Sequence, residues 1–284
     1  MSNNDRSRYK AAAGRWIVRV VMIFSTVFFL YPLGWNILAS FKTNQEFLSN
    51  PFSFPTELNL DNYVRAFTKA KMADYFLNSI FVVVLSTLVL LVFVVPFSYV
   101  ISRYRFYGSK LIMNLYMACI FIQATYIMVP LFLQVNSLGL QDNRVTLGVV
   151  YAVLQFPFAI FVLGGFIRSI PKDYEEAARI DGCSNFRILV NIIVPMAKPG
   201  IATVAMLAAM GFWNEYPLAL VLISSENKKT LPVGLANLFE VQKYATDWSA
   251  LFAALVIVLI PTVALYLIGQ KQLMQGISVG GVKG

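Results

Sequence analysis

The chain has 284 residues, of which 58% are hydrophobic and only 13% are charged, and its mean hydropathy is +0.67. Soluble domains carry about a quarter charged residues, so this composition excludes an ordinary soluble protein and indicates an integral membrane protein. The net charge of +9 is expected to mark membrane orientation, and the absence of histidine removes the most common general base and metal ligand.

Six apolar segments are long enough to cross a bilayer, which requires about 20 residues in helical form. They cover residues 16–39, 76–101, 111–135, 145–167, 199–223 and 250–270. The first segment follows a basic stretch, so it could be either a membrane anchor or a cleaved signal peptide. Its apolar run is longer than the ~7–15 residues of a signal peptide. We therefore predict an all-α integral membrane protein with six transmembrane helices.

Lysine and arginine predict the orientation of these spans. If the N-terminus is inside, the inner segments hold 15 of these residues and the outer loops hold 8. This bias favours both termini in the cytoplasm. The predicted organisation is a cytoplasmic segment at 1–15, one transmembrane domain at 16–270 and a cytoplasmic tail at 271–284.

The loops between the spans differ in kind. The outer loop at 40–75 contains prolines and asparagines typical of turns, followed by a short predicted helix from Asp61 to Lys69. The inner loop at 102–110 is short and basic. The outer loop at 224–249 is predicted to contain an interfacial helix near the stretch LPVGLANLF.

The inner loop at 168–199 between the fourth and fifth spans resembles part of a soluble protein. Acidic residues fill a first helical turn from Asp173, where they complement the helix dipole. Gly182 stands where a helix commonly ends in left-handed geometry. A second helical pattern covers 185–194, and Pro195 with the later Pro199 is predicted to break it before the next span. The sequence predicts a helix, a glycine turn and a second helix.

The residues of this helical loop are compatible with two locations. It either docks into a groove on a soluble partner or lies on the lipid surface as an amphipathic segment. Residues 173–181 carry four acids against two nearby basic residues, Lys172 and Arg179. That balance is unfavourable beside an anionic inner leaflet.

The loop also contains a long motif. Glu176-Ala177-Ala178 is followed after three residues by Gly182 and, nine residues later, by Ile192-Ile193-Val194-Pro195. This arrangement resembles the EAA loop of binding-protein-dependent ABC importer permeases at every fixed position.

Further stretches resemble the sugar-importer branch of that family. They are PKDYEEAARIDG in the loop, WNEY at 213–216, FPTELNLDNY in the first outer loop and GISVGGVKG at the C-terminus. Gly280-Gly281 departs from the more usual Gly-Ala. Together the matches span most of the chain, which resembles the smaller, six-helix permease of the maltose-type carbohydrate uptake group.

The resemblance implies a transport subunit rather than an enzyme. It implies a second, non-identical permease, two ATPase subunits and an extracytoplasmic solute-binding protein that delivers a carbohydrate. ATP and magnesium would be bound by the ATPase subunits, because this chain has no phosphate-binding loop of the form GxxxxGK[ST]. No catalytic residue, metal ligand or cofactor is expected here. The location implied is a bacterial cytoplasmic membrane.

The resemblance also implies docking residues. Ala177, Ala178 and Gly182 would set a close fit and the turn, and Phe186 would pack between the two short helices. The remaining candidates would form a charged rim around them: Glu175, Glu176, Arg179, Asp181 and Arg187. A plain solvated face is the alternative for any single charge.

Glu215 is the only acid within a predicted span, and such residues are functional candidates by default. With Trp213, Asn214 and Tyr216 it forms either a sugar-facing cluster or a structural hydrogen-bond cluster at a helix kinked by proline. Gln123 and Gln155 are further pathway candidates, with helix–helix hydrogen bonding as the alternative.

Two other functions share these features. A permease for a non-sugar solute would carry the same loop motif. An ion-coupled secondary carrier would need intramembrane coupling groups, for which Glu215 alone is thin support. The sequence does not name the sugar, does not establish whether this chain touches it, and leaves the C-terminal tail either docked on the ATPase or disordered.

Overall fold

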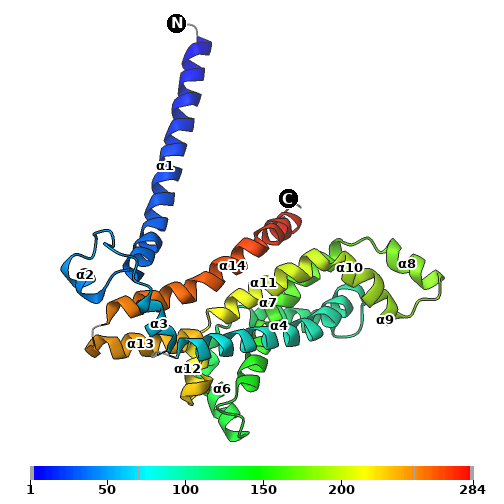
Figure 1. The fold of residues 1–284 in the computed structure, drawn as a ribbon. Coiled ribbons are helices and arrows are strands. Elements are labelled where there is room, and N and C mark those ends of the chain that lie inside the picture. Colours follow the sequence, from blue (N-terminus) through cyan, green and yellow to red (C-terminus); the bar gives the residue numbers. More distant parts are fainter. Residues whose placement is uncertain (1–2, 69–70, 246, 282–284) are drawn as a thin grey trace. The chain divides into compact units, whose positions relative to one another are not determined.

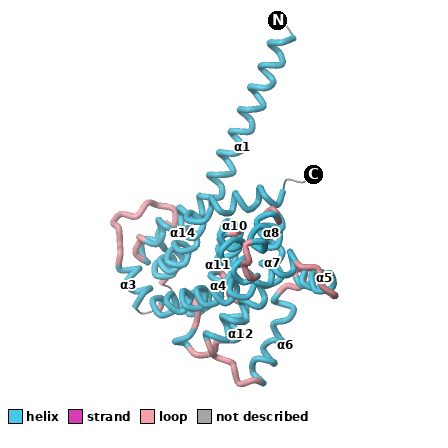
Figure 2. Tube along the Cα trace, turned by 90° about the vertical axis from the view of Figure 1, so that its right-hand side faces the viewer, coloured by secondary structure: helices cyan, strands magenta, loops and turns pink. Residues whose placement is uncertain are grey.

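The computed structural model describes residues 3–68, 71–245 and 247–281, and within those ranges it contains helices and no strand. The predicted all-α class is therefore confirmed (Figure 1 and Figure 2). The α-helices are α1 (Asn3–Ser40), α2 (Asn44–Ser49), α3 (Asp61–Thr68), α4 (Met72–Arg103), α5 (Ser109–Cys119), α6 (Ala124–Ser137), α7 (Arg144–Ser169), α8 (Asp173–Ile180), α9 (Asn185–Ile188), α10 (Val194–Met196), α11 (Lys198–Trp213), α12 (Pro217–Leu222), α13 (Leu231–Ala245) and α14 (Trp248–Gly281). A π-helical turn, η1 (Leu189–Ile193), joins α9 to α10, and a 3₁₀ turn, η2 (Glu226–Lys228), precedes α13.

Four described helical segments are long and apolar enough to cross a membrane. They are Gly14–Ser40, Met72–Arg103, Arg144–Ser169 and Trp248–Gln270. Two bent helix pairs raise the number to as many as six if each pair is one span. These four segments match the predicted spans at 16–39, 76–101, 145–167 and 250–270.

The chain divides into two compact units. The first comprises Met1–Ala70 with Leu238–Ile257, and the second comprises Lys71–Asn237 with Val258–Gly284.

In the first unit, Trp35 near the end of α1 is the centre of an aromatic cluster. Its ring lies 5.3 Å from that of Phe252, and 6.1 Å from those of Phe47 and Phe52. Lys42 is buried beside this cluster, and its ammonium group donates to the carbonyls of residues 50 and 51 at 3.0 and 3.1 Å. These bonds satisfy a charge that would be costly to bury alone.

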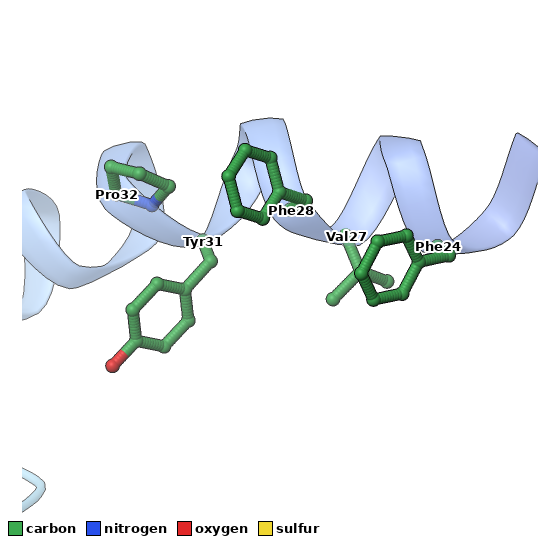
Figure 3. Close-up of a pocket in the computed structure, with 5 residues that line it drawn as sticks. All are labelled: Phe24, Val27, Phe28, Tyr31 and Pro32. Atoms are coloured by element: carbon green, nitrogen blue, oxygen red, sulfur yellow. The ribbon is translucent and has the colours of Figure 1, made fainter.

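The apolar part of α1 has no buried residue in its most hydrophobic window. A surface hollow of about 290 Å³ along it is lined by Phe24, Val27, Phe28, Tyr31 and Pro32 (Figure 3). One helix supplies every wall of the hollow, so it is a groove between neighbouring side chains rather than an enclosed binding site.

In the second unit, α4, α7 and α11 pack against one another and form its core. Figure 1 shows α8 and α9 beyond one end of these three helices. Gly200 in α11 permits a close approach to α7, since a Cβ atom there would lie 2.5 Å from the ring of Phe166. The absence of a side chain at this position therefore sets the spacing of the two helices.

The predicted span at 111–135 is not one straight helix. Helices α5 and α6 are bent by 103° at residues 120–123, where Gln123 adopts an extended conformation. No proline or glycine marks this break, so neither of the usual helix-breaking residues accounts for it.

The predicted span at 199–223 is also interrupted. Helix α11 ends at Trp213 and α12 begins at Pro217, whose ring fits the first helical position because no N–H is needed there. Before this span, the predicted break is present as a 75° bend at residue 197, between Pro195 and Pro199. Pro195 itself lies within α10, and the preceding π-helical turn accommodates it, with the N–H of Val194 bonded to the carbonyl of Leu189.

Candidate functional site

Helix α8 ends in a tight glycine turn. Gly182 has φ of +78°, its N–H donates to the carbonyl of Arg179 at 3.0 Å, and Cys183 N–H donates to that of Ala178 at 2.9 Å. These two bonds form a Schellman motif, which satisfies carbonyls left free at the helix end. The predicted left-handed conformation of Gly182 is therefore confirmed. Ser184 then caps α9 by accepting from the N–H of Arg187 at 3.3 Å.

A buried ion pair fastens α8 to the end of α4. The carboxylate of Glu175 lies 2.6 Å from Nε of Arg103, and both side chains are only 4% exposed. Tyr99 of α4 donates its hydroxyl to the same carboxylate at 3.0 Å, and Arg103 also donates to the carbonyl of Ile170 at 2.7 Å. Glu175 thus differs from its predicted place in a charged rim, because it faces the inside of this chain.

A second polar layer surrounds this pair. The hydroxyl of Tyr104 donates to the side-chain oxygen of Asn185 at 3.1 Å and accepts from the guanidinium of Arg179 at 3.3 Å. The bond to Tyr104 raises the pKa of Arg179 above its ordinary value, although burial opposes this shift, and the guanidinium lies 4.0 Å from Glu175. The end of α4, α8 and α9 are therefore joined by one polar network.

The outer side of the α8–α9 segment presents apolar side chains. Ile180 is 87% exposed and Phe186 is 76% exposed, and Tyr174 is also exposed. We predicted that Phe186 packs between the two short helices, but its side chain instead projects outward. Large apolar side chains exposed on a rigid turn are a common feature of protein–protein contact sites.

The other predicted docking residues divide between the two sides. Ala178 is buried within the chain, one turn along α8 from Glu175. The exposed members are Glu176, Ala177, Arg179, Asp181, Gly182 and Arg187. Only the exposed set is available to a partner in this conformation.

Glu215 lies in the unwound stretch between α11 and α12. Its carboxylate accepts from the N–H groups of Leu218 and Ala219 at 2.8 and 3.1 Å, and it also accepts from the hydroxyl of Tyr151. Two of these three partners belong to the first turn of α12, whose N–H groups have no partner within the helix. The arrangement matches the structural alternative, in which the acid holds a broken helix.

The remaining intramembrane candidates are not brought together into one polar cluster. Trp213 is buried and packs edge-on against Phe76. Asn214 is exposed and its amide donates back to the carbonyl of Met210 at 2.8 Å. The other candidates are exposed or half-buried: Tyr216, Gln123 and Gln155.

A polar cluster that sequence reasoning missed joins two loops predicted to lie outside. Asp142 accepts from the ammonium of Lys228 at 2.8 Å and from the N–H groups of Ser224 and Ser225 at 3.1 and 2.9 Å. These bonds, that of Lys228 first, hold the pKa of Asp142 far below its ordinary value. The positive φ of 54° at Asp142, which aspartate tolerates better than most residues, has no sequence signal of its own.

Within the described residues, no group of three or more histidine, cysteine, aspartate or glutamate side chains is placed to hold a metal ion.

Comparison with known proteins places these features in context. Residues 8–279 match the model of the family described as "Binding-protein-dependent transport system inner membrane component". The chain is 35% identical to the diacetylchitobiose uptake system permease protein NgcG of Streptomyces coelicolor, covering 93% of this chain and 87% of the relative. It is 31% identical to the arabinooligosaccharides transport system permease protein AraQ of Halalkalibacterium halodurans, covering 95% and 96%.

Among the solved structures that are similar over nearly the whole chain is an ABC transporter subunit. It is a chain of a bacterial ABC transporter involved in the import of the acidic polysaccharide alginate, with a TM-score of 0.78 and 27% identity. The similarity covers 95% of this chain and 98% of that one.

Proposed function

We propose that this chain, which belongs to the family of binding-protein-dependent transport system inner membrane components, is the subunit through which an ATP-driven importer takes up a carbohydrate. The single observation that carries the proposal is the α8–α9 segment. It exposes large apolar side chains, those of Tyr174, Ile180 and Phe186, among charged ones, yet a buried ion pair fastens it to a membrane-spanning helix.

The carbohydrate assignment is supported by the named substrates of the relatives. Diacetylchitobiose, arabinooligosaccharides and alginate are all chains of sugar units. The alternative is an importer of a non-sugar solute with the same loop motif. An ion-coupled secondary carrier gains no support, since the hydrogen bonds of Glu215 serve the start of α12 and its neighbour Tyr151.

The proposed assembly places the chain in the cytoplasmic membrane with six spans and both termini in the cytoplasm. Each of the bent helix pairs then counts toward one span. A second permease stands beside the chain, two ATPase subunits lie below it, and a solute-binding protein delivers the sugar from outside. The excess of lysine and arginine in the inner segments supports this orientation.

The proposed mechanism is alternating access driven by the ATPase subunits. The exposed turn from Ile180 to Phe186 sits in a cleft of one ATPase subunit, and closure of the ATPase pair on ATP displaces it. The pair of Glu175 with Arg103 transfers that displacement to α4, because a buried pair cannot separate without a large energetic cost. The packed helices α4, α7 and α11 then rotate as a body and change the side from which the pathway is open.

Gly182 provides the test of the docking role. A Cβ atom at this position would meet nothing within 4 Å, so a substitution acts only through the backbone angle of +78°. Gly182→Val is unfavourable in this conformation, whereas Gly182→Asn adds a side chain that tolerates it. We expect the Val variant to insert into the membrane but to lose the ATPase subunit on purification, and to lose ATP-dependent sugar uptake. The Asn variant should retain most of both.

Normal uptake and normal recovery of the ATPase with the Val variant would overturn the docking role of this turn. Equal loss in both variants would show that added bulk, rather than backbone geometry, disturbs the contact.

A further inference from the structure

We propose that a cavity at the end of α4 binds the phosphate group of an anionic membrane lipid. The cavity measures about 650 Å³, within the range of roughly 300–1,000 Å³ typical of small-molecule sites. Four basic residues line it and no acidic residue does: Arg103, Arg105, Lys110 and Lys172. We name it the basic cavity. The inference rests on the proposed orientation, which places this end of the molecule at the cytoplasmic leaflet.

The four cations come from separate parts of the chain. Arg103 ends α4, Arg105 lies in the following loop, Lys110 is in the first turn of α5, and Lys172 immediately precedes α8. Among the described residues, only Arg103 of these four has a charged partner, namely Glu175. The side chains of the other three form no ion pair or hydrogen bond with the described part of the chain, and all three are exposed.

Several like charges around one cavity repel one another unless an anion enters it. A phosphate diester fits this requirement because it accepts several charge-assisted hydrogen bonds from arginine and lysine at once. Basic pockets on the cytoplasmic side of transmembrane helices are recognised sites for anionic lipid headgroups. The hydroxyl-bearing Ser109, which also lines the cavity, adds a neutral donor.

The surface beside the cavity favours a lipid over a soluble anion. Helix α5 has no buried residue in this chain, and Leu111 and Leu115, one turn apart, are 63% and 58% exposed. Tyr107, between α4 and α5, is fully exposed, as expected for an aromatic residue at the membrane interface. A lipid could therefore place its headgroup in the basic cavity and its acyl chains along α5.

Because Lys172 immediately precedes α8, the bound headgroup would join the α4–α5 loop to the beginning of the docking segment. Anionic lipid would thus stabilise the position of α8 relative to α4. This role would make the importer sensitive to the phosphatidylglycerol content of its membrane.

The test uses the purified importer complex in mild detergent with an equimolar mixture of phosphatidylglycerol and phosphatidylcholine. Bound lipids are counted by native mass spectrometry for the wild type and two double variants. The cavity variant is Arg105→Gln with Lys110→Gln. The matched control is Arg168→Gln with Lys198→Gln, which removes two exposed inner-face charges that do not line the cavity.

We expect the cavity variant to bind phosphatidylglycerol about twenty-five-fold more weakly, from about fivefold for each of the two lost basic residues, and the control to bind like the wild type. The charge-preserving variant Arg105→Lys with Lys110→Arg should retain binding. It also shows whether a loss arises from misfolding, since it alters the same two side chains.

Equal loss in the cavity variant and the control would overturn the site and leave only general attraction to a basic face. A second arm adds inorganic phosphate or glycerol 3-phosphate at millimolar concentration, and full displacement of the lipid by either would assign the cavity to a soluble anion instead. If the cavity variant loses the ATPase subunit but binds lipid like the wild type, Arg105 and Lys110 serve contact with a protein partner rather than with lipid. Lipid count and ATPase recovery are separate readouts of each sample, so failure of this site and failure of the proposed function are distinguishable.

Discussion

Replacement of Glu175 by glutamine should destabilise the protein strongly although the two side chains have nearly the same shape. Within the described residues, the change removes the only negative charge paired with Arg103, whose side chain is 4% exposed and lies 2.6 Å away. Glutamine keeps an oxygen that can accept from Tyr99, and Arg103 keeps its bond to the carbonyl of Ile170. The loss is therefore mainly that of a buried charge without its partner.

Removal of one partner of a buried ion pair commonly costs about 3–5 kcal/mol. The two hydrogen bonds that survive place the expected loss near the lower end, at about 3 kcal/mol. For a chain of this size, 1 kcal/mol lowers the melting temperature by about 2–4 °C. The expected decrease is thus roughly 6–12 °C.

The assay is thermal unfolding of the purified complex in mild detergent, with the chain followed by a thiol-reactive or tryptophan signal. Glu176→Gln is the matched control, because Glu176 is the next residue of the same helix and is exposed. Its effect should stay within about 0.5 kcal/mol. The double variant Glu175→Gln with Arg103→Met removes both charges and should recover part of the loss, since an apolar replacement of a buried pair is often neutral.

Two results would refute this reasoning. One is a Glu175→Gln variant that melts like its Glu176→Gln control. The other is a double variant whose loss of unfolding free energy equals, within about 0.5 kcal/mol, the sum of the losses in Glu175→Gln alone and Arg103→Met alone. That result would mean that the two residues do not interact. A real pair should also matter for transport. Glu175→Gln should lower sugar uptake per ATP hydrolysed while the ATPase subunit stays bound.

Three other contacts in the structure lead to further predictions. Glu215→Gln should lower stability by about 1–2 kcal/mol because it weakens the start of α12. Uptake by this variant should still depend on ATP. Uptake that stops when only the proton gradient is collapsed would contradict this prediction. Because Lys228 lowers the pKa of Asp142, the stability from this bond is complete above the ordinary aspartate pKa of about 3.9 and is lost as the pH falls toward the lowered value. Asp142→Asn should therefore remove the part of the acid sensitivity, measured by melting below about pH 3.9, that belongs to this residue. Gly234→Ala should destabilise by about 1–3 kcal/mol, since a Cβ atom there would lie 2.0 Å from the ring of Tyr75; an unchanged melting temperature would show that the ring moves freely.

Much of the fold was predictable from the sequence because hydropathy and helix-end signals are local. A run of about 20 apolar residues cannot satisfy its backbone in lipid except as a helix, and four such segments appear as predicted. The turn at Gly182 was predictable for the same reason, since glycine adopts its left-handed backbone angle more readily than any other residue. The family motif in the 168–199 loop likewise depends only on residues close together in the chain.

The tertiary structure alone decided which of two adjacent acids is buried. Glu175 and Glu176 are chemically alike, but the helix turns by 100° between them, so only one faces Arg103. That partner lies at the end of another helix, and no local pattern indicates it. For the same reason the sequence did not predict the exposure of Phe186, the break between α5 and α6 or the hydrogen bonds of Asp142. Sequence determined which segments are helical and where the chain turns, whereas contacts between distant residues determined which side chains are held inside and which remain free for a partner.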